Sequence, residues 1–277
     1  MESLSSEIPS PSPSPPPLPL SSSATERAPG LWMALGLIVL YFVLQVAASL
    51  LMTVVIGLFE RISHPGGKNV RGAVEALMQH PAMQAILVMV SLGVAATSVF
   101  LLVWHRWPRL YFRAQPPGFG FSLPRRQSFF ALAVLVGLAA PVLGGLLTQW
   151  FAQGHSVTQD IQQLGGRTPL GLRIPLVLLV ISLGPVVEEL LFRGVLLSAL
   201  LQRWRVVPSV LITSVLFALA HLSGLQFQWF ALPQLMLLAL LLAWLRLRSG
   251  SIWPAVVAHG TNNLLAVAVW FVAVKPS

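Results

Sequence analysis

Long apolar blocks constrain the fold of this sequence more than any other feature. The first block, residues 31–59, contains no charged residue, and similar blocks recur along the rest of the 277-residue chain. A helix of about 20 apolar residues is long enough to cross the hydrocarbon core of a bilayer. Charged residues make up only 9% of the chain, whereas soluble domains carry roughly 25%. We therefore predict an all-α fold, a polytopic bundle of transmembrane helices.

The positions of the blocks predict seven membrane spans. An eighth arises if the long first block, or the Gly184–Pro185 pair within the fourth, divides a span into two. Proline cannot continue the helical hydrogen-bond ladder, so we expect the fourth helix to kink or restart there. The predicted spans cover residues 31–59, 82–104, 128–151, 174–201, 206–222, 227–245 and 252–274.

The first thirty residues have a different composition, rich in proline and serine. Proline lacks an amide donor, and the segment has too few apolar side chains to offset the entropy lost on ordering. We expect residues 1–30 to form a disordered tail before a transmembrane helical domain at 31–277. The tail has no basic region followed by an apolar run, so it is not interpreted as a signal peptide.

The net charge of +9 is interpreted as a topology signal. Most Lys and Arg residues lie between apolar blocks, and the loop after the second span contains five arginines. Because cytoplasmic loops are enriched in Lys and Arg, this loop is predicted to be inside, which also makes the N-terminus cytoplasmic. No basic face with interleaved aromatic residues is visible, so nucleic acid is not an expected partner.

Three of the predicted spans carry polar groups that a lipid-facing helix would not have. They read EELLFR at 188–193, FALAH at 217–221 and HGTNN at 259–263. An ionisable residue at bilayer depth costs roughly 2.5–3.5 kcal/mol on insertion scales. Any one of these residues alone could simply form a hydrogen bond between two helices. Their occurrence together predicts a functional site.

Helical spacing separates the roles within the first motif. Glu189 and Arg193 are four residues apart and share a face, so they are expected to pair with each other. Glu188 is rotated by about 100° around the helix axis and has no arginine partner on its own face. That leaves Glu188 as a candidate general base.

The other two motifs supply complementary groups. His259 and Asn263 are four residues apart, so both can offer donors to an oxygen that becomes negative during a reaction. His221 lies near the end of its span and can help Glu188 hold a water molecule. Phe217 is one turn earlier on the same face, where it is expected to wall off part of the cavity.

The EExxxR, FxxxH and HxxxN patterns, in this order, resemble those of the CAAX prenyl endopeptidase and bacteriocin-processing (CPBP or Abi) family of intramembrane proteases. The resemblance implies a helical core with a conical cavity at about residues 174–274 and endopeptidase activity near the C-terminus of a membrane-associated, possibly prenylated, substrate. The plasma (inner) membrane of a bacterium is the expected location. By the same resemblance, water is activated by Glu188 and His221, the oxyanion is bound by His259 and Asn263, and Glu189 and Arg193 support the site.

The same residues are compatible with two alternatives. No cofactor is expected, but Glu188, His221 and His259 could instead bind zinc as two nitrogens and an oxygen. Against zinc, the sequence has no HExxH motif and no cysteine. The second alternative is a non-catalytic carrier or binding scaffold. Carriers usually show internal repeats, whereas the polar residues here lie in the C-terminal half.

Overall fold

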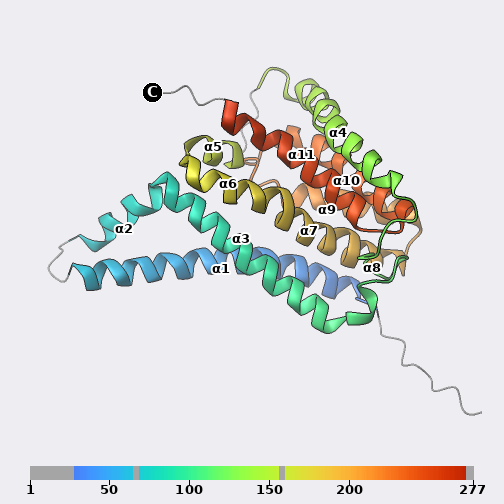
Figure 1. Cartoon of the computed structure of the whole chain (residues 1–277), viewed down its shortest axis with the longest axis horizontal. Helices are drawn as coiled ribbons and strands as arrows, with labels where there is room; N and C mark the ends of the chain where they lie inside the picture. The colour runs from blue at the N-terminus through green and yellow to red at the C-terminus, as the bar shows by residue number, and fades with distance from the viewer. Residues whose placement is uncertain (1–27, 65–68, 156–159, 273–277) are drawn as a thin grey trace, which may run out of the picture.

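The computed structural model describes residues 28–64, 69–155 and 160–272. Over these ranges the chain consists of helices and connecting turns, without a β-strand (Figure 1). The prediction of an all-α fold is confirmed. The elements in chain order are α1 (Leu31–Ser63), α2 (Val70–Gln79), α3 (Pro81–Arg106), η1 (Pro108–Leu110), α4 (Ser128–Ala152), α5 (Asp160–Arg167), α6 (Leu170–Leu178), η2 (Leu179–Leu183), α7 (Gly184–Glu189), η3 (Leu190–Leu196), α8 (Leu197–Leu201), α9 (Val206–Ala220), η4 (Trp229–Ala231), α10 (Leu232–Ser249) and α11 (Trp253–Val272).

Helices long and apolar enough to cross a membrane account for five of the predicted spans. They cover residues 31–63, 81–106, 128–152, 170–201 and 229–249. The remaining two predicted spans are also helical. However, α9 has only 15 residues, and α11, with 20 residues, is not among the five. The chain is therefore a helical membrane protein, while the predicted count of seven to eight spans is not confirmed among the residues described.

The predicted tail of residues 1–30 lies almost entirely outside the described residues, which begin at residue 28. The first membrane helix, α1, starts at Leu31, directly after the tail and where the first span was predicted to begin. Just before α1, the carbonyl oxygen of Pro29 accepts a hydrogen bond of 3.1 Å from Gln202 Nε2. This bond attaches the start of α1 to the end of α8.

The fourth predicted span contains an irregularity at the Gly184–Pro185 pair. The helix continues over residues 170–201, but two π-helical turns, η2 and η3, flank α7. Pro185 has no N–H to donate, and it stands at the start of α7, immediately after the wider π turn. The expected restart thus takes the form of a change in helical winding. Glu188 and Glu189 lie in the short α-helical segment between two turns of a kind often found at functional sites.

The helix built from α6, η2, α7, η3 and α8 occupies the middle of the bundle. Figure 1 shows it between the crossing helices α1 and α3 on one side and the group of α4, α9, α10 and α11 on the other. All residues of η3 are buried. The motif at 188–193 therefore points into protein rather than into lipid.

Glycine allows α11 to approach two neighbouring helices closely. A Cβ atom added at Gly260 would collide with the backbone carbonyl oxygen of Ile181 in η2. Gly137 of α4 lies against the carbonyl oxygen of Ala258, which a Cβ would approach to 2.5 Å. These contacts fix α11, and with it the HGTNN motif, against the irregular part of the central helix.

Two buried arginines anchor connecting segments at opposite ends of the bundle. At one end, the Arg246 guanidinium in α10 donates to the carbonyl oxygens of Ala114 (2.8 Å) and Gly118 (2.7 Å) in the arginine-rich loop. At the other end, Arg173 in α6 donates to the carbonyl oxygens of Thr168 (2.7 Å) and Trp270 (2.5 Å). The end of α10 thus lies with residues 107–127, and the end of α11 lies with α5.

Candidate active site

The structure brings Glu188, His221 and His259 together from three separate helical segments. Glu188 is in α7, His221 immediately follows α9, and His259 is in α11. The Oε2 atom of Glu188 is 3.4 Å from Nε2 of His221 and 3.8 Å from Nε2 of His259. One carboxylate oxygen therefore faces two imidazole rings.

A hydrogen bond at Nδ1 orients each of these imidazole rings. His221 Nδ1 lies 2.8 Å from the carbonyl oxygen of Phe217, which can only accept, so Nδ1 carries the proton. His259 Nδ1 lies 2.9 Å from Oε1 of Glu189. With the Nδ1 atoms occupied in this way, both Nε2 atoms are directed at Glu188. Each Nε2 accepts in the neutral ring and donates only in the imidazolium form.

The predicted pair of Glu189 and Arg193 is present and fully buried. Arg193 Nη1 donates to Glu189 Oε1 at 2.9 Å, and both side chains are 0% exposed. Arg193 Nη2 donates to the carbonyl oxygen of Ala239 in α10 at 3.0 Å. Because Glu189 Oε1 also accepts from His259, this single oxygen connects the ion pair to the imidazole that faces Glu188.

Phe217 forms an aromatic wall beside both imidazoles. Its ring centroid is 4.5 Å from that of His221 and 5.7 Å from that of His259. The Arg193 guanidinium lies 4.5 Å above the same ring, a distance at which the cation is attracted to the π-face. Phe217 is 1% exposed. The predicted position of this residue next to the site agrees with the structure.

Asn263, the predicted partner of His259 at the oxyanion, forms hydrogen bonds to η2 and to its neighbour in the sequence. Its Nδ2 donates to the carbonyl oxygen of Val180 in η2 at 3.0 Å, and its Oδ1 accepts from Asn262 Nδ2 at 3.3 Å. Among the residues described, Asn263 has no hydrogen bond or ion pair with Glu188 or either histidine. The spacing of four residues predicted that Asn263 lies on the same helix face as His259. It could not predict that the π turn η2 places the carbonyl oxygen of Val180 next to the Asn263 amide.

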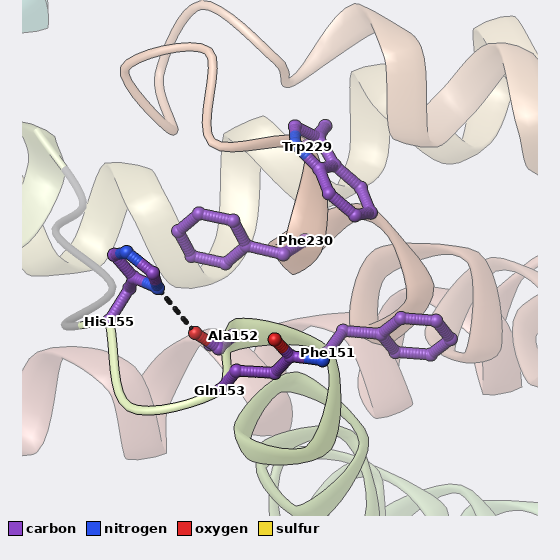
Figure 2. A pocket seen from close by; sticks show the side chains of 6 residues that line it. All are labelled: Phe151, Ala152, Gln153, His155, Trp229 and Phe230. Carbon is purple, nitrogen blue, oxygen red and sulfur yellow. Dashed lines mark hydrogen bonds between the residues drawn. The ribbon is translucent and has the colours of Figure 1, made fainter.

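The accessible part of the site lies on the side of His221. The Glu188 side chain is 20% exposed and His221 is 32% exposed, compared with 5% for His259. A shallow pocket of about 260 Å³ is found elsewhere, where α4 ends and η4 begins (Figure 2). It is lined by Phe151, Ala152, Gln153, His155, Trp229 and Phe230. None of the predicted site residues belongs to this pocket, so it is separate from the Glu188 cluster.

Sequence analysis missed one further polar residue near the cluster. Tyr41 of α1 is 2% exposed and belongs to the same buried cluster as Val187 and Leu190, on either side of the Glu188–Glu189 pair. The available signal was weak, because Tyr41 is a single phenol within a long apolar block of a chain that has two tyrosines. Only the packing of α1 against the central helix brings it near the site.

The comparison with protein families identifies the segment that contains this geometry. Residues 170–265 match the family model described as Rce1-like, type II CAAX prenyl endopeptidase. This segment, the Rce1-like segment, is similar to that family. It contains all three polar motifs, so the resemblance to the CAAX prenyl endopeptidase and bacteriocin-processing family is confirmed over this range. No curated protein and no solved structure matches the chain.

The limits of the Rce1-like segment agree with the architecture. It begins at the first residue of α6 and ends within α11. It therefore includes the central helix, α9 with the adjoining His221, and the part of α11 that contains His259. Helices α1 to α5 lie outside the matched range. Tyr41, in α1, lies outside the Rce1-like segment as well.

Proposed function

We propose that this chain is a CAAX-type intramembrane endopeptidase. It hydrolyses a peptide bond near the C-terminus of a membrane-associated or lipidated protein or peptide, prenylated substrates included. One observation carries the proposal: within the Rce1-like segment, Glu188 Oε2 faces the Nε2 atoms of His221 and His259 at 3.4 Å and 3.8 Å. A carboxylate beside two imidazoles can both remove and return protons. We place the catalytic core at about residues 174–274.

The proposed reaction is direct addition of water to the scissile carbonyl. Glu188, assisted by His221, takes one proton from water while the water oxygen bonds to the carbonyl carbon, and the carbonyl electron pair moves to its oxygen. When this pair returns, the C–N bond breaks and Glu188 delivers the proton to the leaving nitrogen. The products are a carboxylic acid and an amine, and no acyl-enzyme forms.

His259 and Asn263 are proposed to stabilise the negative oxygen. A single such donor is worth about 2.7–4 kcal/mol of transition-state energy. The Glu189 carboxylate at Nδ1 of His259 orients the imidazole, and Nε2 is the proposed donor of this ring. The amide of Asn263 has two N–H bonds. One of them donates to Val180, and the other is the proposed donor to the substrate.

Hydrolysis by the full-length protein in liposomes tests this proposal. The substrates are a library of membrane-tethered peptides, with and without a prenyl group, and the products are identified by mass spectrometry. We expect Glu188→Gln and His259→Ala to abolish cleavage, because each removes a group that acts on water or on the oxyanion. The control is Glu75→Gln in α2, where an exposed glutamate pairs with Arg71. Unchanged cleavage by Glu188→Gln would overturn the assignment.

Zinc-dependent hydrolysis is the alternative mechanism for the same site. It is favoured by the convergence of both Nε2 atoms on one carboxylate oxygen, since histidine and glutamate are common zinc ligands. The described residues contain no group of three or more His, Cys, Asp or Glu side chains that could hold a metal ion. We therefore propose a reaction without a metal cofactor. Chelator dialysis decides the question: retained activity supports Glu188 as the base, and loss that zinc restores supports the metal.

We also propose that α9 and α11 cross the membrane, which gives seven spans. The end of α10 contacts the arginine-rich loop, because Arg125 N donates to the carbonyl oxygen of Ser249 at 3.0 Å. An even number of crossings must then separate residues 106 and 249, which requires α9 in addition to α4, the central helix and α10. The contact of Trp270 with Arg173 at the opposite end supports α11 as the seventh span. The excess of positive charge in the loops on one side supports a cytoplasmic N-terminus. We also propose a bacterial plasma membrane as the host membrane.

A further inference from the structure

A buried proline interrupts the hydrogen bonding of the central helix close to the candidate base. In a π turn such as η2, each N–H donates to the carbonyl five residues earlier, and at its end the Gly184 N–H donates in this way to Leu179. Continued by one residue, the same winding would pair an N–H at position 185 with the carbonyl oxygen of Val180. Pro185 has no N–H, so it cannot make this bond.

Helix α11 supplies a donor to this carbonyl from a side chain. Nδ2 of Asn263 donates to the carbonyl oxygen of Val180 at 3.0 Å. The next carbonyl, that of Ile181, lies four residues before Pro185 and would be its acceptor in a regular α-helix. Ile181 faces Gly260, where an added Cβ would collide with the carbonyl oxygen. Helix α11 therefore packs on the two carbonyls to which Pro185 cannot donate.

The bond to Val180 also determines which way the Asn263 amide faces. A carbonyl oxygen can only accept a hydrogen bond, so it attracts the NH₂ end of the amide and repels the oxygen end. The Oδ1 atom of Asn263 accepts from Nδ2 of Asn262 at 3.3 Å, which favours the same orientation. Because the amide is planar, these two partners together fix the direction of the second N–H of Asn263.

We propose that Pro185 is a positioning residue for Asn263. Because it has no N–H, it leaves the Val180 carbonyl to the Asn263 amide, whose second N–H is the proposed donor to the oxyanion. A donor that is held in place before the reaction stabilises negative charge without having to reorganise. The short helix α7 then carries the base, Glu188, and also orients a donor on another helix. The inference rests on the proposed function, since it deepens the assignment of Asn263.

The variant Pro185→Ala restores an N–H that can compete with Asn263 for the Val180 carbonyl. We expect kcat for a membrane-tethered peptide to fall about 3-fold to 10-fold with little change in KM, as for the loss of one neutral hydrogen bond. Pro185→Ser restores the same N–H with a different side chain and should give the same loss. The matched control is Pro175→Ala, at an exposed proline within α6 of the same central helix, which should keep the wild-type kcat.

A double-mutant cycle distinguishes positioning of Asn263 from a general structural effect of the proline. If Pro185 acts through Asn263, Pro185→Ala should cause little further loss of kcat in a protein that already carries Asn263→Ala. An equal loss of kcat in both backgrounds would show that the two residues act independently, and the inference would be overturned.

Nuclear magnetic resonance of the asparagine side chains adds a readout that does not require activity. The chain has three asparagines, so selective isotope labelling isolates their amide signals, and the signal of Asn263 is identified by its loss in Asn263→Ala. We expect this signal to move in both Pro185 variants and to stay in place in Pro175→Ala.

The two readouts separate failure of this inference from failure of the proposed function. If the wild type cleaves peptides but both Pro185 variants keep the wild-type kcat and Asn263 signal, the role of Pro185 is overturned and the proposed function stands. If no peptide is cleaved, the proposed function fails, and the Asn263 signal alone decides whether Pro185 leaves the Val180 carbonyl to this amide.

Discussion

Two ion pairs of this chain have the same spacing and nearly the same length but opposite environments. Arg193 and Glu189 are separated by four residues and 2.9 Å with both side chains 0% exposed. Arg71 and Glu75 are also four residues apart, at 2.8 Å, with side chains 90% and 59% exposed. Removing one partner of a buried pair leaves an uncompensated charge and costs about 3–5 kcal/mol. An exposed helical pair is worth about 0.3–0.5 kcal/mol.

We therefore predict that Arg193→Met lowers the free energy of unfolding by about 3–5 kcal/mol, whereas Arg71→Met lowers it by less than about 0.5 kcal/mol. Replacing both members of a buried pair by apolar residues is often close to neutral. The double variant Glu189→Leu/Arg193→Met still leaves His259 Nδ1 without its acceptor, a loss of about 1–3 kcal/mol. The double variant should thus be more stable than Arg193→Met alone.

Denaturant titration in mixed micelles, followed by tryptophan fluorescence, measures all of these differences. The order of the free energies of unfolding is the informative result. Arg71→Met should be more stable than the double variant, and the double variant should be more stable than Arg193→Met. If Arg193→Met and Arg71→Met lost the same amount of stability, the Glu189–Arg193 pair would not be buried as described. If the double variant loses as much stability as Glu189→Leu and Arg193→Met lose together when each is measured alone, Glu189 and Arg193 do not interact.

Three other outcomes follow from the packing and the topology. Gly260→Ala is expected to lower the melting temperature, because its Cβ meets the backbone of η2. Gly36→Ala, with no atom within 4 Å of its Cβ, should raise the free energy of unfolding by roughly 0.5–1 kcal/mol. If Gly260→Ala were the more stable of the two variants, the close approach of α11 would be contradicted. Asn263→Ala should reduce kcat by about 10²–10³-fold in the peptide assay, and an unchanged kcat would remove Asn263 from the oxyanion site. Because the chain has no cysteine, the variants Arg113→Cys and Gln153→Cys each carry a single thiol that can be labelled in sealed vesicles. We expect a membrane-impermeant maleimide to reach these two thiols from opposite sides of the membrane. Labelling of both from the same side would refute the seven-span arrangement.

The membrane helices could be predicted closely because lipid allows few other structures. Backbone groups in a bilayer must be satisfied within the segment that carries them, so an uncharged apolar block becomes a helix. The predicted starts of two spans coincide with the first residues of α1, Leu31, and α4, Ser128. The i,i+4 pairing of Glu189 with Arg193 was also predictable, because it depends on local spacing alone.

Contacts between helices were less accessible to sequence reasoning. The bond from Asn263 to Val180 arises because η2 winds as a π turn and Gly260 lets α11 approach it closely. The burial of Tyr41 depends on which face of an almost uniformly apolar helix turns toward the protein. Neither feature leaves a periodic pattern in the sequence. The catalytic roles of Glu188 and His259 remain predictions, to be decided by the cleavage assay.

The shared oxygen of Glu189 limits how this protein can be engineered. Oε1 accepts hydrogen bonds from both the guanidinium of Arg193 and the imidazole of His259. Under the proposed mechanism, both the stability of the fold and the rate of turnover therefore depend on this one atom. A directed-evolution campaign that varies Glu189 would change both traits together and in the same direction. Substitutions that raise stability without changing activity should instead be sought on the exposed surface of α1, where the side chains do not contact the candidate active site.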